Sequence, residues 1–200
     1  MLLRIRDASS LVIDTLGDSA REQNAAVACF YFDFAAQKEQ SPTIILGSLL
    51  KQLVSGLKKI PAEILKAFRD QEQVIGGRRL ELDEILEMLQ DFSSSQQTFI
   101  CIDALDECMA EYRAKVLDSL KQILEKSSTT RVFLTGRFHI QEEVGKHLGG
   151  KVVGVSITPT KDDIVRFLQA KLKEDTIPDA MDKSLERDIL RTIPETISEM

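Results

Sequence analysis

A run of mostly apolar residues, Phe99 to Ile102, leads directly into Asp103, and two more acids, Asp106 and Glu107, follow closely. A continuous apolar run is typical of a strand buried within a parallel sheet. In open α/β sheets the ligand crevice lies beyond the carboxyl ends of the strands, which is where Asp103 would stand. A carboxylate there can hold Mg²⁺ against the phosphates of a nucleotide, and a second acid can orient an attacking water. The segment therefore has the pattern of a Walker B element.

Three further segments have the apolar, β-branched or aromatic composition of strands. They lie near residues 26–34, 131–135 and 151–157, and helical patterns separate them. The alternation of strands with helices predicts an α/β fold with a mostly parallel sheet and helices on both faces. Residues after about 159 have helical patterns throughout and are expected to begin a small helical subdomain.

Local start and stop signals place the helices. Ser41 and Pro42 suit the N-cap and first turn of one helix, and Thr160 with Asp163 forms a capping box before another. Gly149 is a typical signal for the C-terminal end of a helix. Apolar stripes at helical spacing predict further helices near residues 11–16, 61–68, 82–92, 116–124 and 140–148.

The composition excludes several classes of protein. A net charge of −6 and a pI of about 5.1 leave no basic surface for nonspecific nucleic-acid binding, so no nucleic-acid partner is expected. No apolar run approaches the roughly 18 residues of a membrane span, and the N-terminus lacks the apolar core of a secretory signal. Cys29, Cys101 and Cys108 lack CxxC spacing and are expected to be reduced, buried thiols of a cytoplasmic protein.

The phosphate loop that a Walker B element needs, G-x-x-x-x-G-K-[ST], is absent from the chain. The pair Gly145-Lys146 lies within a helical pattern, and Gly149-Gly150-Lys151 precedes a predicted strand instead of following one. Neither can aim backbone N–H groups and a helix N-terminus at a phosphate. His139 and His147 have no metal-ligand spacing and are expected to be ordinary surface or half-buried residues. A hydrolase built on the three acids is disfavoured, because no nucleophile or base partner can be identified.

Several strings occur in a fixed order along the chain: Ala28-Cys-Phe-Tyr-Phe-Asp-Phe34, Ile102-Asp-Ala-Leu-Asp-Glu-Cys108, Phe133-Leu-Thr-Gly-Arg137 and Ile157-Thr-Pro-Thr-Lys-Asp-Asp-Ile164. Together they resemble the NACHT NTPase domain of fungal NOD-like receptors, STAND proteins that often continue into ankyrin repeats. The resemblance covers nearly the whole chain and implies a P-loop NTPase-like three-layer sandwich that lacks its P-loop strand. It implies a partial NACHT-type nucleotide-binding domain over residues 1–158 and the start of a helical subdomain over residues 159–200.

The resemblance also implies a role for each charged residue of the site. Asp103 would hold Mg²⁺, and Asp106 and Glu107 would be the acidic pair that positions the attacking water. Arg137 would be the sensor arginine that faces the nucleotide, a task that suits a permanently charged guanidinium. The residues on either side of Arg137 depart from the Thr-Ser-Arg-Pro that is usual in the family.

Arg4-Ile5-Arg6 stands where the family has its Gly-Lys-Ser/Thr, so the chain is expected to be a fragment or a degenerate, non-hydrolysing relative. Intact relatives would be switches in immunity or self-recognition receptors, driven by Mg²⁺ with ATP or GTP. Weak or absent nucleotide binding and little hydrolysis are expected here. The alternative is an interaction module with a vestigial NTPase fold, which binds protein partners or associates with itself. Loss of the central strand before the phosphate loop is expected to cause poor stability or rearranged strand pairing.

Overall fold

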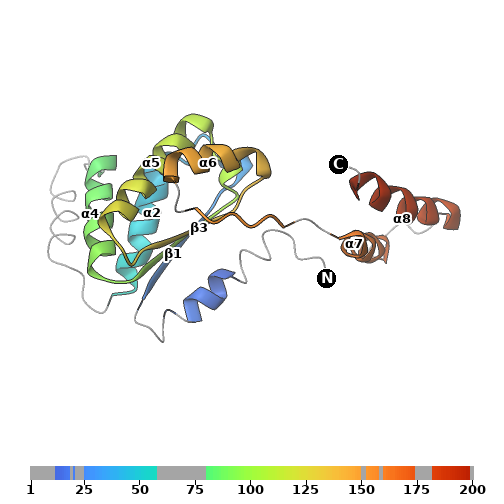
Figure 1. The fold of residues 1–200 in the computed structure, drawn as a ribbon, viewed down its shortest axis with the longest axis horizontal. Helices are drawn as coiled ribbons and strands as arrows, with labels where there is room; N and C mark the ends of the chain where they lie inside the picture. The colour runs from blue at the N-terminus through green and yellow to red at the C-terminus, as the bar shows by residue number, and fades with distance from the viewer. Residues whose placement is uncertain are drawn as a thin grey trace. The chain divides into compact units, whose positions relative to one another are not determined.

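The computed structural model describes residues 12–18, 20, 25–57, 80–149, 152–157, 160–173 and 182–198. The chain divides into two compact units, one over Ala8–Gly154 and one that combines Met1–Asp7 with Val155–Met200. Among the described residues, the larger unit contains the sheet and the helices that cover it, and the smaller unit contains a pair of helices (Figure 1).

The sheet of the larger unit consists of parallel strands, as the sequence predicts. In the described part of the chain it has three strands in the order β1 (Ala26–Tyr31), β2 (Thr98–Asp103) and β3 (Arg131–Leu134). The register aligns Cys29 with Cys101, and Cys101 with Phe133. The parallel α/β architecture is confirmed, and β2 runs from Thr98 to the acid that the sequence places at its end.

The first strand is shorter than the predicted segment 26–34. It ends at Tyr31, and the short 3₁₀ helix η1 (Phe34–Ala36) follows. The side chain of Asp33 accepts a hydrogen bond from the backbone N–H of Ala35, which starts this helical turn. The local cap therefore ends the strand even though the aromatic composition continues to Phe34.

The prediction of a strand near residues 151–157 is wrong. Residues 152–157 have no strand structure, and no described strand pairs with them. Val153, Val155 and Ile157 are exposed. A strand is stable only when its backbone groups bond to a neighbour, so valine-rich composition is not enough without one.

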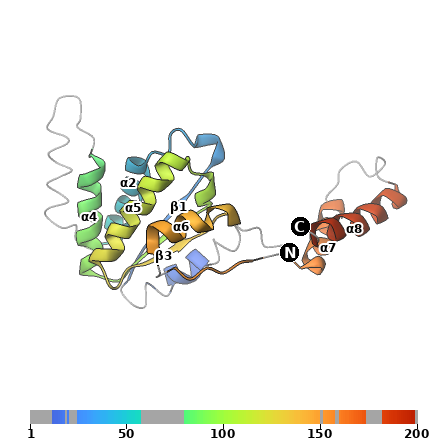
Figure 2. The same cartoon turned by 45° about the horizontal axis from the view of Figure 1, so that its top comes forward.

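Helices cover both faces of the sheet, which confirms the three-layer arrangement. The main helices of the larger unit are α2 (Pro42–Ser55), α4 (Leu82–Ser95), α5 (Ala110–Lys126) and α6 (Gln141–Leu148). α2, α4 and α5 lie on one side of the sheet, and a short helix over residues 12–18 lies on the other (Figures 1 and 2). The architecture is that of a layered α/β sandwich around a parallel sheet.

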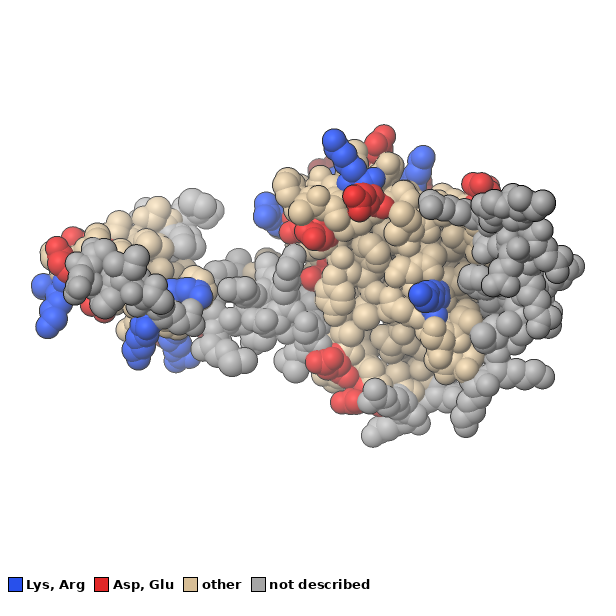
Figure 3. Space-filling model, turned by 180° about the vertical axis from the view of Figure 1, so that it is seen from behind, with Lys and Arg blue, Asp and Glu red and all other residues tan. Residues whose placement is uncertain are grey.

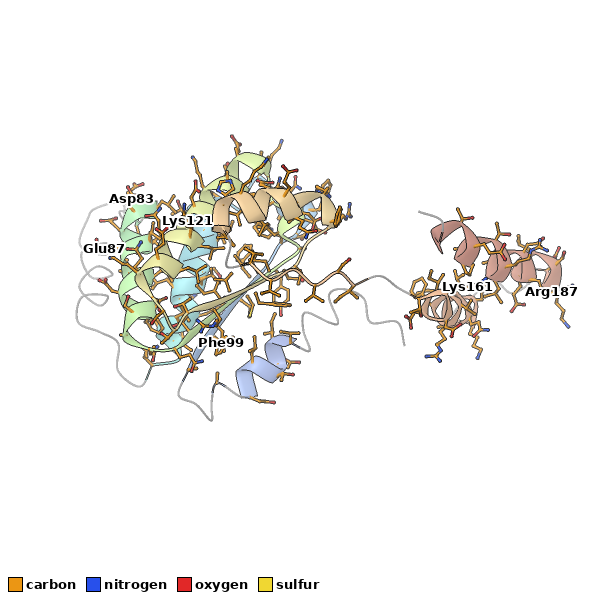
Figure 4. The ribbon with its side chains drawn as sticks, in the orientation of Figure 1. Asp83, Glu87, Phe99, Lys121, Lys161 and Arg187 are labelled. Carbon is orange, nitrogen blue, oxygen red and sulfur yellow. The ribbon has the colours of Figure 1, made fainter. Side chains whose placement is uncertain are left out.

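The hydrophobic core lies between the sheet and α2, α4 and α5. Alternate residues of β2 point into it, and Ile100 and Ile102 are completely buried among leucines of the helices. The intervening residues face the other side of the sheet, where Phe99 lies near the helix over residues 12–18 (Figure 4). Because side chains of a strand alternate between faces, Asp103 shares this second face with Phe99 and Cys101.

The predicted start and stop signals of the helices are confirmed where they can be seen. The side chain of Ser41 caps α2, with Pro42 in the first turn. Gly149 follows α6 with a φ of 68°, in the left-handed region that favours glycine. The predicted helix near 61–68 lies outside the described residues.

The smaller unit is a pair of helices, α7 (Lys161–Lys173) and α8 (Lys183–Ser198), that pack on each other. Thr160 and Asp163 form the predicted capping box at the start of α7. The N–H of Thr160 donates to the Asp163 carboxylate at 3.0 Å, and the N–H of Asp163 donates to the Thr160 hydroxyl at 3.2 Å. Among the described residues after 160, α7 and α8 are helices, as the apolar patterns there predict.

One face of the larger unit has a broad area without charged side chains (Figure 3). On the face of the larger unit in Figure 3, uncharged residues cover a broad area, and acidic and basic side chains lie mixed along its upper rim. No described helix combines the length and the apolar character needed to cross a membrane.

Candidate functional site

The site begins where β2 and β3 end side by side. Asp103 is the last residue of β2, and its side chain is almost fully buried, with 2% of the residue exposed. The hydroxyl of Thr135, which directly follows β3, donates a hydrogen bond of 2.5 Å to Oδ1 of Asp103. The same hydroxyl accepts a bond of 2.9 Å from the backbone N–H of Ala104. A neutral residue of the neighbouring strand therefore holds the buried carboxylate in place.

Thr135 is the site residue that sequence reasoning missed. The predicted sensor was Arg137, two positions further on, because a guanidinium is the more obvious phosphate ligand. The register aligns Ile102 with Leu134, so the next positions, Asp103 and Thr135, are neighbours. A rule that extends the register one position beyond the aligned ends of two adjacent parallel strands would have found it.

The turn after Asp103 has an unusual backbone. Ala104 has a φ of 55° and a ψ of 45°, and among the described residues it is the one non-glycine residue with a positive φ. Such a conformation costs about 1–2 kcal/mol for an L-residue and persists where surrounding bonds enforce it. Here the carbonyl of Thr135 accepts a bond of 2.9 Å from the N–H of Leu105, which is fully buried. The turn thus carries the acids of the 3₁₀ helix η2 (Leu105–Glu107) away from the strand axis.

The structure brings Asp106 and Arg137 together, as a common site predicts. The carboxylate of Asp106 accepts a bond of 3.2 Å from the backbone N–H of Arg137 and lies 3.3 Å from its Nε atom. The Asp106 side chain is 8% exposed and that of Arg137 is 74% exposed. The buried acid therefore anchors a guanidinium that extends into solvent.

Gly136 leaves room for the side chain of Ile140. A Cβ atom at this position would lie 2.6 Å from Cδ1 of Ile140 and 3.4 Å from Oδ1 of Asp106. A side chain at this position would therefore meet Ile140, which belongs to the short helix η3 (Phe138–Ile140).

Glu107 turns to the other side, toward β1. Its Oε2 atom accepts a bond of 3.1 Å from the backbone N–H of Phe34, and its backbone carbonyl accepts a bond of 2.6 Å from Nε2 of Gln37. The two predicted acids therefore have different partners, since Asp106 contacts the loop after β3 and Glu107 the loop after β1. In the described part of the chain no three histidines, cysteines or acids converge as a metal-binding group.

The donor atoms at the end of β2 fit Mg²⁺. The carboxylate of Asp103 and the hydroxyl of Thr135 are oxygen ligands, and Mg²⁺ in nucleotide sites takes one or two such carboxylates and fills its other positions with water and phosphate. The phosphate side is different, because the described residues contain no glycine loop that opens a helix after a strand. Gly145 and Lys146 lie inside α6, as the sequence predicts.

The cysteines are expected to be buried thiols, and the histidines to be ordinary surface or half-buried residues. The three thiols are free, and burial raises the pKa of Cys101 to about 12 and that of Cys108 to about 11, so both stay protonated at neutral pH. Cys29, on the edge strand β1, is only partly buried, in contrast to the expectation. His147 lies 2.7 Å from a carboxylate oxygen of Asp118 on the neighbouring helix.

Comparison with known proteins gives a family and a distant structural likeness. The family model described as nephrocystin 3, N-terminal matches residues 8–137. Among solved structures, the Walker-type ATPase paby2304 of Pyrococcus abyssi matches with a TM-score of 0.43 and 14% sequence identity. The match covers 86% of this chain and 53% of that one, so this chain spans about half the length of that relative. No curated protein matches the chain.

Proposed function

Because the chain belongs to the nephrocystin 3 N-terminal family, we propose that residues 8–154 are a nucleotide-binding signalling domain of the NACHT type. The observation that carries the proposal is the buried Asp103 carboxylate at the end of β2, held by the Thr135 hydroxyl from the end of β3. An acid in this position, next to a polar residue of the adjacent strand, is the arrangement that holds Mg²⁺ beside a nucleotide.

The residues have separate tasks in this proposal. Asp103, with Thr135 beside it, would hold Mg²⁺ with bound ATP or GTP, and the ion would neutralise charge on the phosphates. Asp106 holds the loop that carries Arg137, and the solvent-exposed guanidinium is available to an anion. Glu107 would orient water for hydrolysis. Without a glycine loop and its lysine, the chain is expected to bind nucleotide weakly and to turn over little.

The proposed role in a receptor rests on the sequence segments around these acids, such as residues 102–108. Their resemblance to fungal NOD-like receptors supports a switch in an immunity or self-recognition receptor, which would act through protein partners or self-association of the domain. In such a switch, bound nucleotide would favour one association state of the domain over another.

The test is a thermal melt of the chain followed by circular dichroism, with and without Mg-ATP or Mg-GTP. A ligand at about ten times its Kd would raise the melting temperature of wild type by about 2–5 °C. Asp103→Asn, which keeps an acceptor for the Thr135 hydroxyl, would lose the rise. Asp91→Asn removes one exposed charge on α4 and serves as the matched control, which would keep it. A melt that is indifferent to nucleotide in wild type rejects the proposal.

One observation favours a second function, a protein-interaction module that does not hydrolyse nucleotide. The carboxylates of Asp106 and Glu107 are both engaged in bonds that hold loops of the fold. A domain in which these acids have only structural tasks would associate with partners or with itself without nucleotide. Size-exclusion chromatography with light scattering, with and without Mg-ATP, distinguishes the two functions.

A further inference from the structure

The loop between β1 and α2 reaches across to Glu107. The backbone N–H of Phe34 donates to the carboxylate of Glu107 at 3.1 Å, and the side-chain amide of Gln37 donates to its backbone carbonyl at 2.6 Å. The two contacts join residues that are 73 and 70 positions apart in the sequence. One contact holds the acidic group and the other holds the backbone that carries it.

Local hydrogen bonds also form within this loop. The Asp33 side chain caps η1 through the N–H of Ala35 at 3.0 Å. The side-chain amide of Gln40 bonds to both the N–H and the carbonyl of Asp33, each at 3.3 Å. These bonds join residues of the loop to one another, whereas Glu107 gains from Phe34 a contact that a freely rotating surface carboxylate lacks.

We propose that this loop restrains Glu107, and that release of Phe34 N–H and Gln37 from it controls when the carboxylate is available to water. The inference rests on the proposed function for the task of Glu107, and it adds the regulation of that acid. Gln37 is then a positioning residue, which acts through the backbone of Glu107. While the restraint is closed, the Glu107 carboxylate is turned toward β1, on the side away from Asp106 and Arg137.

The restraint can be reached from outside the protein. The Phe34 residue is 69% exposed, although its backbone N–H is the donor that holds Glu107. A displacement of this exposed residue would move the donor and release the carboxylate. A partner that contacts Phe34 could thus release the Glu107 carboxylate without binding at the end of β2.

The chain offers matched variants that separate the backbone donor from the side chain. Phe34→Pro removes the N–H and the ring, whereas Phe34→Ala removes the ring alone. Proline is tolerated at the first position of a helical turn. It also suits this site because Asp33, which precedes it, has a φ of −123° and a ψ of 117°, an extended conformation of the kind that proline favours in its predecessor.

A second pair separates the two glutamines of the loop. Gln37→Ala removes the donor to Glu107. Gln40→Ala removes a side chain whose described hydrogen bonds go to the backbone of Asp33, so it tests for a general loosening of the loop.

The experiment measures the reaction of carboxylates with a water-soluble carbodiimide and an amine, by peptide mass spectrometry of the whole chain without nucleotide. Labelling of Glu107 is expected to be about fivefold faster in Phe34→Pro and Gln37→Ala than in wild type, the scale of one lost net hydrogen bond. Phe34→Ala and Gln40→Ala are expected to label like wild type. Exposed Glu111 calibrates the reagent, and buried Asp103 reports on general unfolding.

Equal labelling of Glu107 in all variants overturns the restraint, and so does an increase in the two control variants or a parallel increase at Asp103. The outcome does not depend on nucleotide. Suppose that Glu107 labels faster in Phe34→Pro and Gln37→Ala, while Mg-ATP leaves the melting temperature of wild type unchanged: the restraint is then retained and the proposed function is rejected. If labelling is unchanged and Mg-ATP raises the melting temperature, the restraint is rejected and the proposed function is retained.

Discussion

Two apolar segments of this chain have strand-like composition, and only one of them is a strand. Thr98–Asp103 lies between β1 and β3, and its Ile100 is fully buried. Residues 152–157 are also rich in β-branched side chains, yet they pair with no described strand and Val153 is 89% exposed. The difference teaches that β-propensity here expresses a fit to neighbouring strands and helices, which one segment has and the other lacks.

The largest expected effect comes from the buried segment. Ile100→Ala is expected to lower the free energy of unfolding of the larger unit by about 2–5 kcal/mol, because it leaves a cavity between β2 and the helices. Val153→Ala in the unpaired segment is the matched change and is expected to alter it by less than about 0.5 kcal/mol. Urea unfolding followed by circular dichroism measures both. Similar losses in the two variants would mean that residues 152–157 are packed in solution.

The next effect concerns the end of β2, which its neighbour holds in place. Thr135→Val removes the hydroxyl that donates to Asp103 and accepts from Ala104, and is expected to cost about 1–3 kcal/mol. Thr135→Ser keeps the hydroxyl and is expected to recover most of this loss. The same urea experiment measures both variants, and an equal cost for valine and serine would assign the effect to packing of the methyl group.

The edge of the sheet at β1 gives a smaller effect. The side-chain amide of Gln52 on α2 bonds to the N–H of Cys29 at 3.0 Å and to its carbonyl at 2.8 Å, so it occupies both backbone groups of this edge residue. Gln52→Ala is expected to cost about 1 kcal/mol and to increase self-association through the exposed edge. Lys51→Ala, at an exposed neighbouring position, is the control. Light scattering against concentration would contradict the edge role if both variants behaved alike.

The smallest effect concerns the start of α7, which the capping box of Thr160 and Asp163 stabilises locally. Hydrogen bonds from the hydroxyl and N–H of Thr160 lower the pKa of Asp163 below its ordinary value of 3.8. The cap is therefore fully present above pH 3.8, and its contribution is lost as the pH falls through the lowered pKa. A pH titration of ellipticity at the helix band is expected to show this loss in wild type and in Asp162→Asn, and not in Asp163→Asn. Equal titrations in all three chains would contradict it.

The site shows the same division between local and distant information. Asp103 is recognisable because an apolar run ends in it, and Asp106 with Arg137 could be expected together because both follow adjacent strands. Thr135 and Gln37 could not be recognised as partners of these acids, since their roles depend on strand register and on a loop about 70 positions away. The orientation of Glu107 toward β1 is a consequence of that loop.

By itself, the sequence determined the parts whose causes lie within a few residues of each other. These include the helix starts at Ser41 and Thr160, the stop at Gly149, and the buried run that ends at Asp103. Only the tertiary structure decided whether residues 152–157 become a strand, and which donors hold Asp103 and Glu107. The physical reason is that caps and helical turns satisfy backbone groups locally, whereas a strand or a buried carboxylate needs partners from distant segments.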